Sequence, residues 1–99
     1  MLHIVNKSHA QTSTLQSCLR LAQPGSALLL IEDAVYAATS AGAATSGVVE
    51  ALKRLKVYAL LPDVDARGMN GKLLDGVTAV DYGGFVDLVA EHHTCQSWL

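Results

Sequence analysis

Charged side chains are scarce in this sequence of 99 residues. Asp, Glu, Lys and Arg make up 16% of the chain, against about 25% in a typical soluble domain. The formal net charge is -2, so the chain lacks the excess of positive charge with which proteins bind nucleic acid or anionic lipid directly. Hydrophobic residues reach 51%, and a fully polar surface is hard to build from the remainder. We therefore expect a subunit that buries part of its surface against partners.

Long hydrophobic runs and a secretion signal are also missing. The longest aliphatic run, Ala27 to Ile31, is far shorter than the roughly 20 apolar residues that a membrane-spanning helix needs. Met1 to Lys7 has the pattern of a strand, without the basic segment and apolar stretch of a signal peptide. We expect a cytoplasmic protein with no membrane contact, in which the two cysteines, Cys18 and Cys95, stay reduced.

Short aliphatic runs bounded by turn residues predict four strands: Leu2 to Val5, Ala27 to Ile31, Leu55 to Leu60 and Val77 to Val80. The second run has no polar alternation, as in a strand covered on both faces. Segments with helical spacing lie between the runs. Strand alternating with helix predicts a parallel sheet with right-handed crossovers. The length admits one domain, residues 1–99.

Four helical stretches are expected between and after the strands. The first carries Leu15, Cys18, Leu19 and Ala22 on one face, with Ser13 and Gln16 as a capping box at its start. The second begins near Ala34, is interrupted by a mobile loop over Thr39 to Gly47 that is rich in small residues, and resumes at Val48 to Arg54. The third is a short helix from Pro62 to Gly68, and the fourth runs from Phe85 to His92.

The carboxyl ends of parallel strands are where open sheets bind ligands. Here they carry Asn6-Lys7-Ser8, Glu32-Asp33, Pro62-Asp63 and Asp81-Tyr82. Two interpretations stay open: ordinary solvated loops, or a functional or subunit-contacting rim. Asp63 and Arg67 have the i, i+4 order of a surface ion pair, and a subunit contact is the alternative.

Neither cysteine has the surroundings of an obvious reactive or metal-binding group. Cys18 is a candidate persulfide acceptor, but it lies on the apolar stripe past the first helical turn, where a core cysteine is the better interpretation. Cys95 follows His92 and His93 in an H-H-x-C pattern with too few ligands for a structural metal site, so a solvated helix end is expected. Gly42 to Gly47 lacks the Lys and Ser/Thr of a nucleotide-binding loop.

The chain ends in two large apolar residues, Trp98 and Leu99. Chain ends are usually polar and frayed, so this ending needs a surface on which to dock. The dock is either the domain's own sheet or a neighbouring subunit. We favour the neighbour, because tryptophan is a common interface anchor, and we count Trp98 and Leu99 with Asp63 and Arg67 as interface candidates.

Short segments along nearly the whole chain resemble one known family in their order and spacing. They are Met1-Leu2-His3 with Asn6-Lys7-Ser8, Ser17-Cys18-Leu19-Arg20, Glu32 to Ala38, Val57 to Leu60, Asp63 with Ala66-Arg67-Gly68, Val80-Asp81-Tyr82, Phe85 to Leu88, and Gln96-Ser97-Trp98-Leu99. On these segments the chain resembles the DsrH/TusB family. The resemblance implies a single flavodoxin-like (DsrE-like) α/β domain, with a parallel sheet of four to five strands and helices on both faces.

The resemblance also implies partners. Such proteins assemble with two paralogous DsrE-like subunits, of the TusC/TusD or DsrF/DsrE type, into a heterohexamer that passes persulfide sulfur to a small carrier of the TusE or DsrC type. The sulfur is carried by a cysteine after the third strand of a paralogue, near an Arg-Gly pair. Val57 to Gly68 contains no cysteine here. The resemblance thus implies a subunit that is not an enzyme by itself. We expect no cofactor and no metal, because the residues form neither a nucleotide-binding loop nor a sufficient set of metal ligands.

Four functions remain open on this basis. The leading one is a non-catalytic subunit of a sulfurtransferase complex that acts toward 2-thiolation of the tRNA wobble uridine, with no direct contact to the RNA. The alternatives are a DsrH-like subunit of a DsrEFH complex in cytoplasmic sulfur oxidation and a thiol protein that carries a persulfide on Cys18. A free-standing ligand-binding domain would instead be a stable monomer.

Overall fold

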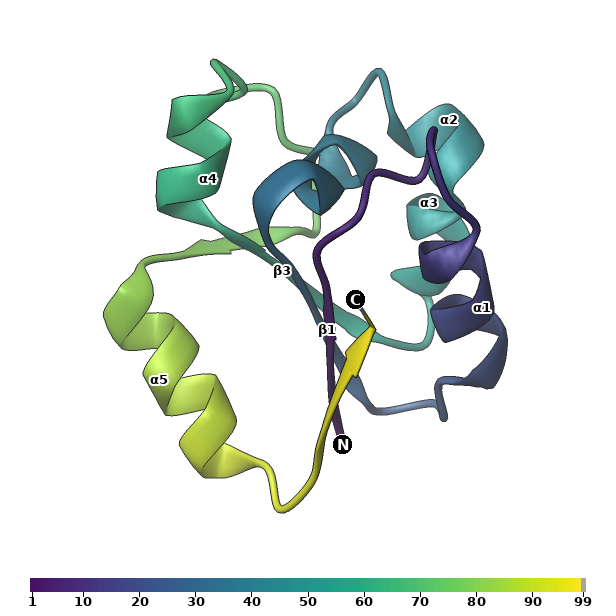
Figure 1. The fold of residues 1–99 in the computed structure, drawn as a ribbon, viewed down its shortest axis with the longest axis vertical. Helices are drawn as coiled ribbons and strands as arrows, with labels where there is room; N and C mark the ends of the chain where they lie inside the picture. Colours follow the sequence, from purple (N-terminus) through teal and green to yellow (C-terminus); the bar gives the residue numbers. More distant parts are fainter. Residues whose placement is uncertain (99) are drawn as a thin grey trace.

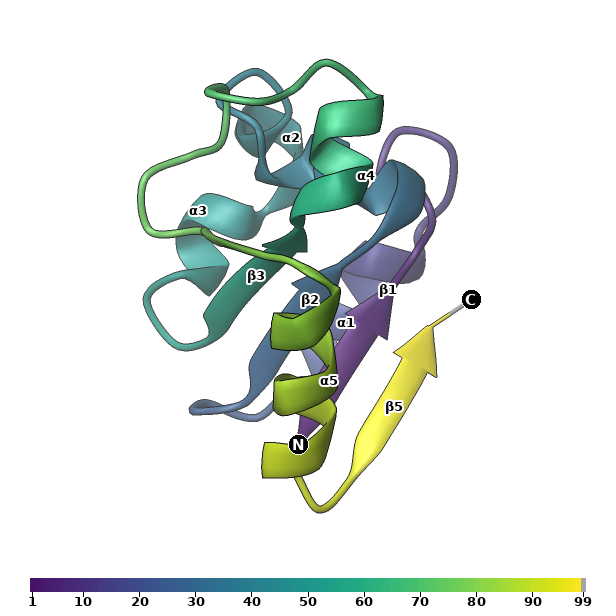
Figure 2. The same cartoon turned by 90° about the vertical axis from the view of Figure 1, so that its left-hand side faces the viewer.

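The computed structural model describes residues 1–98, which contain one sheet of five parallel strands (Figures 1 and 2). The strand order is β4-β3-β2-β1-β5. The strands are β1 (Leu2–Val5), β2 (Ala27–Leu30), β3 (Lys56–Leu60), β4 (Thr78–Val80) and β5 (Cys95–Trp98). The first four match the predicted runs, and the flavodoxin-like α/β class is confirmed. The fifth was not assigned from the sequence, because its exposed residues form no aliphatic run.

The helices are α1 (Thr14–Leu21), the 3₁₀ helix η1 (Glu32–Ala38), α2 (Ala43–Ser46), α3 (Val48–Ala51), α4 (Leu61–Ala66) and α5 (Tyr82–Glu91). Ser13 is the N-cap of α1, but its side chain forms no capping hydrogen bond, so the predicted capping box is absent. The small-residue stretch predicted as a loop contains α2. A Cβ on Gly42 would lie 2.0 Å from the Tyr36 carbonyl oxygen, so η1 and α2 approach closely only because this residue is glycine.

One face of the sheet is covered thickly and the other thinly. Val5, Leu28 and Val57 point to the first face and pack in a large cluster with α1, η1 and α3. Leu2, Ile4 and other residues of the second face pack against Leu88 of α5. Figure 2 shows α5 lying alone across this second face as the chain returns from β4 to β5.

The C-terminal segment docks on the domain's own sheet. β5 pairs with β1 in parallel, with Trp98 opposite Val5. Trp98 Nε1 donates a hydrogen bond to His3 Nδ1 over 3.1 Å, and His3 is buried. The neighbouring subunit that we favoured as the dock is therefore not needed for Trp98, because Trp98 belongs to the edge strand β5, which pairs with β1 of the same domain. Leu99, the other candidate at this end, lies outside the described residues.

Candidate functional site

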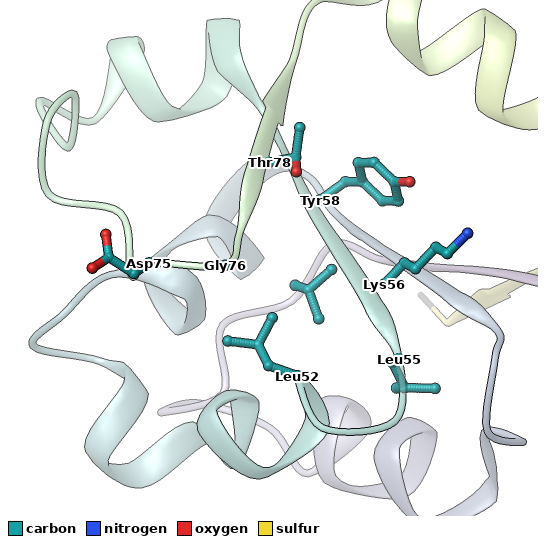
Figure 3. Close-up of a pocket in the computed structure, with 8 residues that line it drawn as sticks. Leu52, Leu55, Lys56, Tyr58, Asp75, Gly76 and Thr78 are labelled. Atoms are coloured by element: carbon teal, nitrogen blue, oxygen red, sulfur yellow. The ribbon is translucent and has the colours of Figure 1, made fainter.

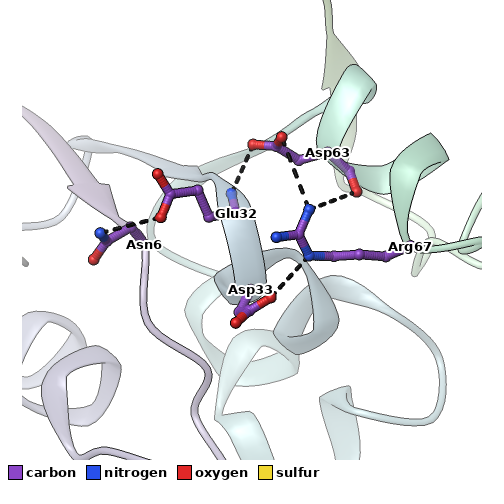
Figure 4. Close-up of polar contacts among 5 residues, drawn as sticks. All are labelled: Asn6, Glu32, Asp33, Asp63 and Arg67. Atoms are coloured by element: carbon purple, nitrogen blue, oxygen red, sulfur yellow. Dashed lines mark hydrogen bonds and ion pairs between the residues drawn. The ribbon is translucent and has the colours of Figure 1, made fainter.

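Polar side chains from three strand ends meet at the carboxyl edge of the sheet (Figure 4). Asn6 follows β1, and Glu32 and Asp33 follow β2. Asp63 comes from α4, directly after β3, and Arg67 is the C-cap residue of that helix. We call these five residues the strand-end cluster. Asn6 Nδ2 donates to Glu32 Oε2 over 3.4 Å, which joins the β1 and β2 ends. Three of the four predicted strand ends thus contribute to one connected group, whereas Asp81, after β4, accepts a hydrogen bond from the Gly84 N–H of its own helix instead.

Glu32 has an unusual backbone at the centre of this cluster. Its φ angle is 51°, in the left-handed region that non-glycine residues rarely adopt. Its N–H donates to Asp63 Oδ2 over 2.7 Å. Asp63 therefore stabilises the strained turn that redirects the chain from β2 into η1, because without it this N–H would lose its acceptor.

Arg67 links α4 to η1. Its Nε donates to Asp33 Oδ1 over 2.9 Å, and its Nη1 lies 3.9 Å from Asp63 Oδ1. The i, i+4 pair that the sequence predicted therefore forms, but the shorter contact is to Asp33, 34 positions away. Spacing along a helix reveals the first partner, whereas only the fold brings the second into reach.

The cluster is built to hold the loops together. Its carboxylates accept hydrogen bonds from the cluster's own amide, backbone and guanidinium groups. It includes no thiol, hydroxyl or imidazole, so it provides no nucleophile for sulfur or acyl transfer. Because Asp63 and Arg67 are only partly buried, the cluster is also a surface that another protein can contact.

Cys18 lies in the core. Its side chain is 0% exposed and packs in the hydrophobic core with Leu15 and Leu19. Burial raises the pKa of the Cys18 thiol to about 11, and the nearby Arg54 guanidinium offsets only part of that effect. At neutral pH the thiolate fraction is therefore very small, and a persulfide donor cannot reach the sulfur while the domain is folded.

Cys95 and the two histidines before it belong to different parts of the fold. His92 ends α5 and its Nδ1 lies 2.7 Å from the Leu88 carbonyl oxygen, whereas Cys95 is the first residue of β5. The expected helix end therefore holds for His92 and is wrong for Cys95. Residues 1–98 contain no group of three or more His, Cys, Asp or Glu side chains placed to bind a metal.

A cavity of about 480 Å³ lies at the opposite edge of the sheet, beside the starts of β3 and β4 (Figure 3). Its lining residues are Leu52, Leu55, Lys56, Val57, Tyr58, Asp75, Gly76 and Thr78. Figure 3 shows the Lys56 and Tyr58 side chains extending on one side of β3, with Asp75 on the loop at the other side. The polar groups therefore do not converge on one point, as they do in most small-molecule sites.

Fold and site together define a class: a DsrE-like α/β domain whose strand ends carry an ion-paired polar cluster. Comparison with known proteins gives the family. The family model described as "DsrH like protein" matches residues 7–95. The chain is 36% identical to Protein TusB of Shigella flexneri, 37% to that of Pectobacterium parmentieri and 38% to that of Enterobacter sp. (strain 638), each over 99% of this chain and 100% of the relative. The chain belongs to the DsrH/TusB family of sulfur-relay subunits.

Solved structures support the fold. The ychN protein from E. coli has a TM-score of 0.80 at 22% identity and covers 97% of both chains. The protein MTH1491 from Methanobacterium thermoautotrophicum has a TM-score of 0.73 at 20% identity, over 97% of this chain and 95% of that one. No helix within residues 1–98 is long and apolar enough to cross a membrane.

Proposed function

We propose that this chain is a non-catalytic subunit of a cytoplasmic sulfur-relay complex that acts toward 2-thiolation of the tRNA wobble uridine. Its partners are two paralogous DsrE-like subunits of the TusC/TusD type, and the complex delivers sulfur to a small carrier of the TusE type. The chain supports the assembly, and a cysteine of a paralogue carries the persulfide. The relatives reported above, each a Protein TusB, support this pathway.

The observation that carries the non-catalytic role is the strand end after β3. The family resemblance places the sulfur-carrying cysteine of the paralogue there, and this chain has Asp63, whose carboxylate is occupied by the Glu32 N–H. The buried Cys18 cannot substitute, because a persulfide acceptor must be reached by its donor. Sulfur therefore passes through the complex without a covalent step on this chain.

Radioactive sulfur tests the proposal. The full chain is co-expressed with the two paralogous subunits of the same genome, and the purified complex is incubated with a cysteine desulfurase and ³⁵S-cysteine. We expect label on a paralogue and none on this chain in non-reducing gels, and wobble-uridine thiolation that depends on the presence of this chain. Label on this chain that disappears in Cys18→Ser would instead establish Cys18 as a carrier.

The description of the matching family also supports an alternative pathway. Because the matching family is described as DsrH, a DsrEFH-type complex in sulfur oxidation, with a carrier of the DsrC type, uses the same subunit. Deleting the gene distinguishes the two: loss of 2-thiouridine from tRNA supports the proposal, and loss of growth on reduced sulfur with intact tRNA thiolation supports the alternative.

A further inference from the structure

Within residues 1–98, one side-chain hydrogen bond joins β5 to the rest of the domain, and a histidine accepts it. Trp98 Nε1 donates to His3 Nδ1 over 3.1 Å. An indole N–H only donates, so Nδ1 is the acceptor and the neutral His3 ring carries its proton on Nε2. A protonated imidazole donates from both nitrogens and has no acceptor to offer. The contact therefore requires a neutral His3.

His3 lies at the boundary between β1 and β5 and is shielded from water. Its side chain is 5% exposed and shares the first face of the sheet with Val5. Its partners in the neighbouring strands are Leu28 on β2 and Gln96 on β5. The His3 and Trp98 ring centroids are 6.2 Å apart. A proton added to this ring is therefore a buried charge.

The elements around His3 offer no negative side chain to stabilise that charge. β2, β5 and α1 are the main elements packed against β1, and none of the four contains an aspartate or glutamate. Arg54 adds a positive charge to this region, because it donates to two carbonyl oxygens at the end of α1. The charged and titratable groups around His3 are the Met1 amino group, Arg20, Arg54, and the Cys18 and Cys95 thiols. Burial, and to a smaller extent the positive amino terminus, accordingly lower the pKa of His3 below 6.5.

β5 can leave the sheet without disturbing the core. It lies at the edge and pairs with β1 alone (Figure 2). Cys95, Gln96 and Ser97 are exposed, and Trp98 is only partly buried. The buried residues of both core clusters all belong to other elements. Terminal segments with so few buried contacts open locally at a lower free energy than the core.

We propose that β5 is a pH-sensitive edge strand, in which protonation of His3 breaks the contact to Trp98 and releases β5 from β1 while the rest of the sheet stays folded. Release exposes the His3 ring to water, where it binds a proton with the ordinary affinity of imidazole. Below about pH 6.5 the ratio of released to docked β5 therefore rises by up to about tenfold per pH unit. Release also uncovers the backbone groups along the edge of β1, with which another strand can pair. This inference is independent of the proposed function, because every contact in it lies within this chain.

Hydrogen exchange of backbone amides in the full chain tests the release. Protection is measured by mass spectrometry at about pH 7.5 and about pH 5.5, corrected for the intrinsic pH dependence of exchange. We expect protection of the β5 amides to fall about threefold or more between these pH values. Low urea concentrations should leave β5 protection nearly unchanged, because local release exposes little surface, whereas β2 amides should be better protected and should lose protection as urea is added. A smaller fall in β5, or β5 protection equal to that of β2 in size and urea dependence, overturns the proposal.

Variants identify the titrating group. His3→Gln removes the imidazole but keeps an oxygen that can accept the Trp98 N–H, so β5 protection should become independent of pH. The matched control is His9→Gln, in the loop after β1, where His9 Nε2 contacts Thr45 Oγ1; it should keep the native pH dependence. Equal pH dependence in the native protein and His3→Gln overturns the proposal.

Trp98→Phe keeps the test decisive if circular dichroism shows that His3→Gln does not fold. This variant removes the donor and retains His3, so β5 protection should already be about threefold or more below the native value at about pH 7.5. β5 protection equal to that of the native chain at this pH shows that the contact does not hold the strand, and it overturns the proposal.

Discussion

The contact between Trp98 and His3 gives the most specific stability prediction. Trp98→Phe keeps an aromatic ring on β5 but removes the N–H that donates to His3 Nδ1 over 3.1 Å. A net hydrogen bond contributes about 0.5 to 1.5 kcal/mol, and a buried acceptor left without a partner costs about 1 to 3 kcal/mol. Because His3 is buried while Trp98 is partly exposed, water reaches part of the vacated space. We expect a loss of about 1 to 2 kcal/mol in the free energy of unfolding.

For a domain of this size such a loss lowers the melting temperature by roughly 5 to 15 °C. Circular dichroism at neutral pH and one protein concentration measures it. Tyr82→Phe is the matched control, because it removes the hydroxyl of an aromatic residue that is 62% exposed and should leave the melting temperature unchanged. A Trp98→Phe protein that melts within about 1 °C of the native protein would refute the reasoning.

Three further predictions follow from buried or constrained groups. Burial, and to a smaller extent the positive amino terminus, lower the pKa of His3 below 6.5 in the folded protein, so the unfolded chain binds the proton more readily. The free energy of unfolding should therefore be constant above about pH 6.5 and fall as the pH drops below it. Urea unfolding at several pH values should show that His3→Gln flattens this dependence. Asp63→Ala should cost about 1 to 2 kcal/mol because the strained Glu32 loses its acceptor, whereas Asp65→Ala, at an exposed position on the same helix, should cost much less in the same assay. Iodoacetamide should label the exposed Cys95 and not Cys18 in the folded protein. Cys18→Ser should lower the free energy of unfolding by about 1 to 3 kcal/mol if the serine hydroxyl is unpaired, with little effect on sulfur transfer. A stable, assembled Cys18→Ser protein without transfer would contradict the non-catalytic role.

The success of strand prediction depended on where each strand lies in the sheet. β2 is central and covered on both faces, so all four of its residues are buried and apolar and the run is conspicuous in the sequence. β5 lies at the edge, and Cys95, Gln96 and Ser97 are exposed. A strand with little to bury has no hydrophobic pattern, and its existence depends on the hydrogen bonds that β1 offers.

Of the contacts in the strand-end cluster, the sequence could predict only those between residues close together in the chain. Asp63 lies in α4 and Arg67 is its C-cap residue, and their i, i+4 spacing was sufficient to pair them. The Arg67 contact to Asp33 and the Asp63 contact to the Glu32 N–H join residues that are 34 and 31 positions apart. Local spacing contains no information about such distances, because they are set by the parallel alignment of β2 and β3.

The sequence by itself determined the class of fold, the core position of Cys18 and the family, because each depends on local periodicity or on the order of short segments. Only the tertiary structure decided where Trp98 docks and which part of α5 stays exposed. Phe85, Leu88 and Val89 are all apolar and their spacing puts them near one face of a helix, yet Leu88 is buried and Val89 is 40% exposed. The physical reason is that periodicity shows which side chains are apolar, whereas the sheet that a helix crosses decides how many of them it can cover.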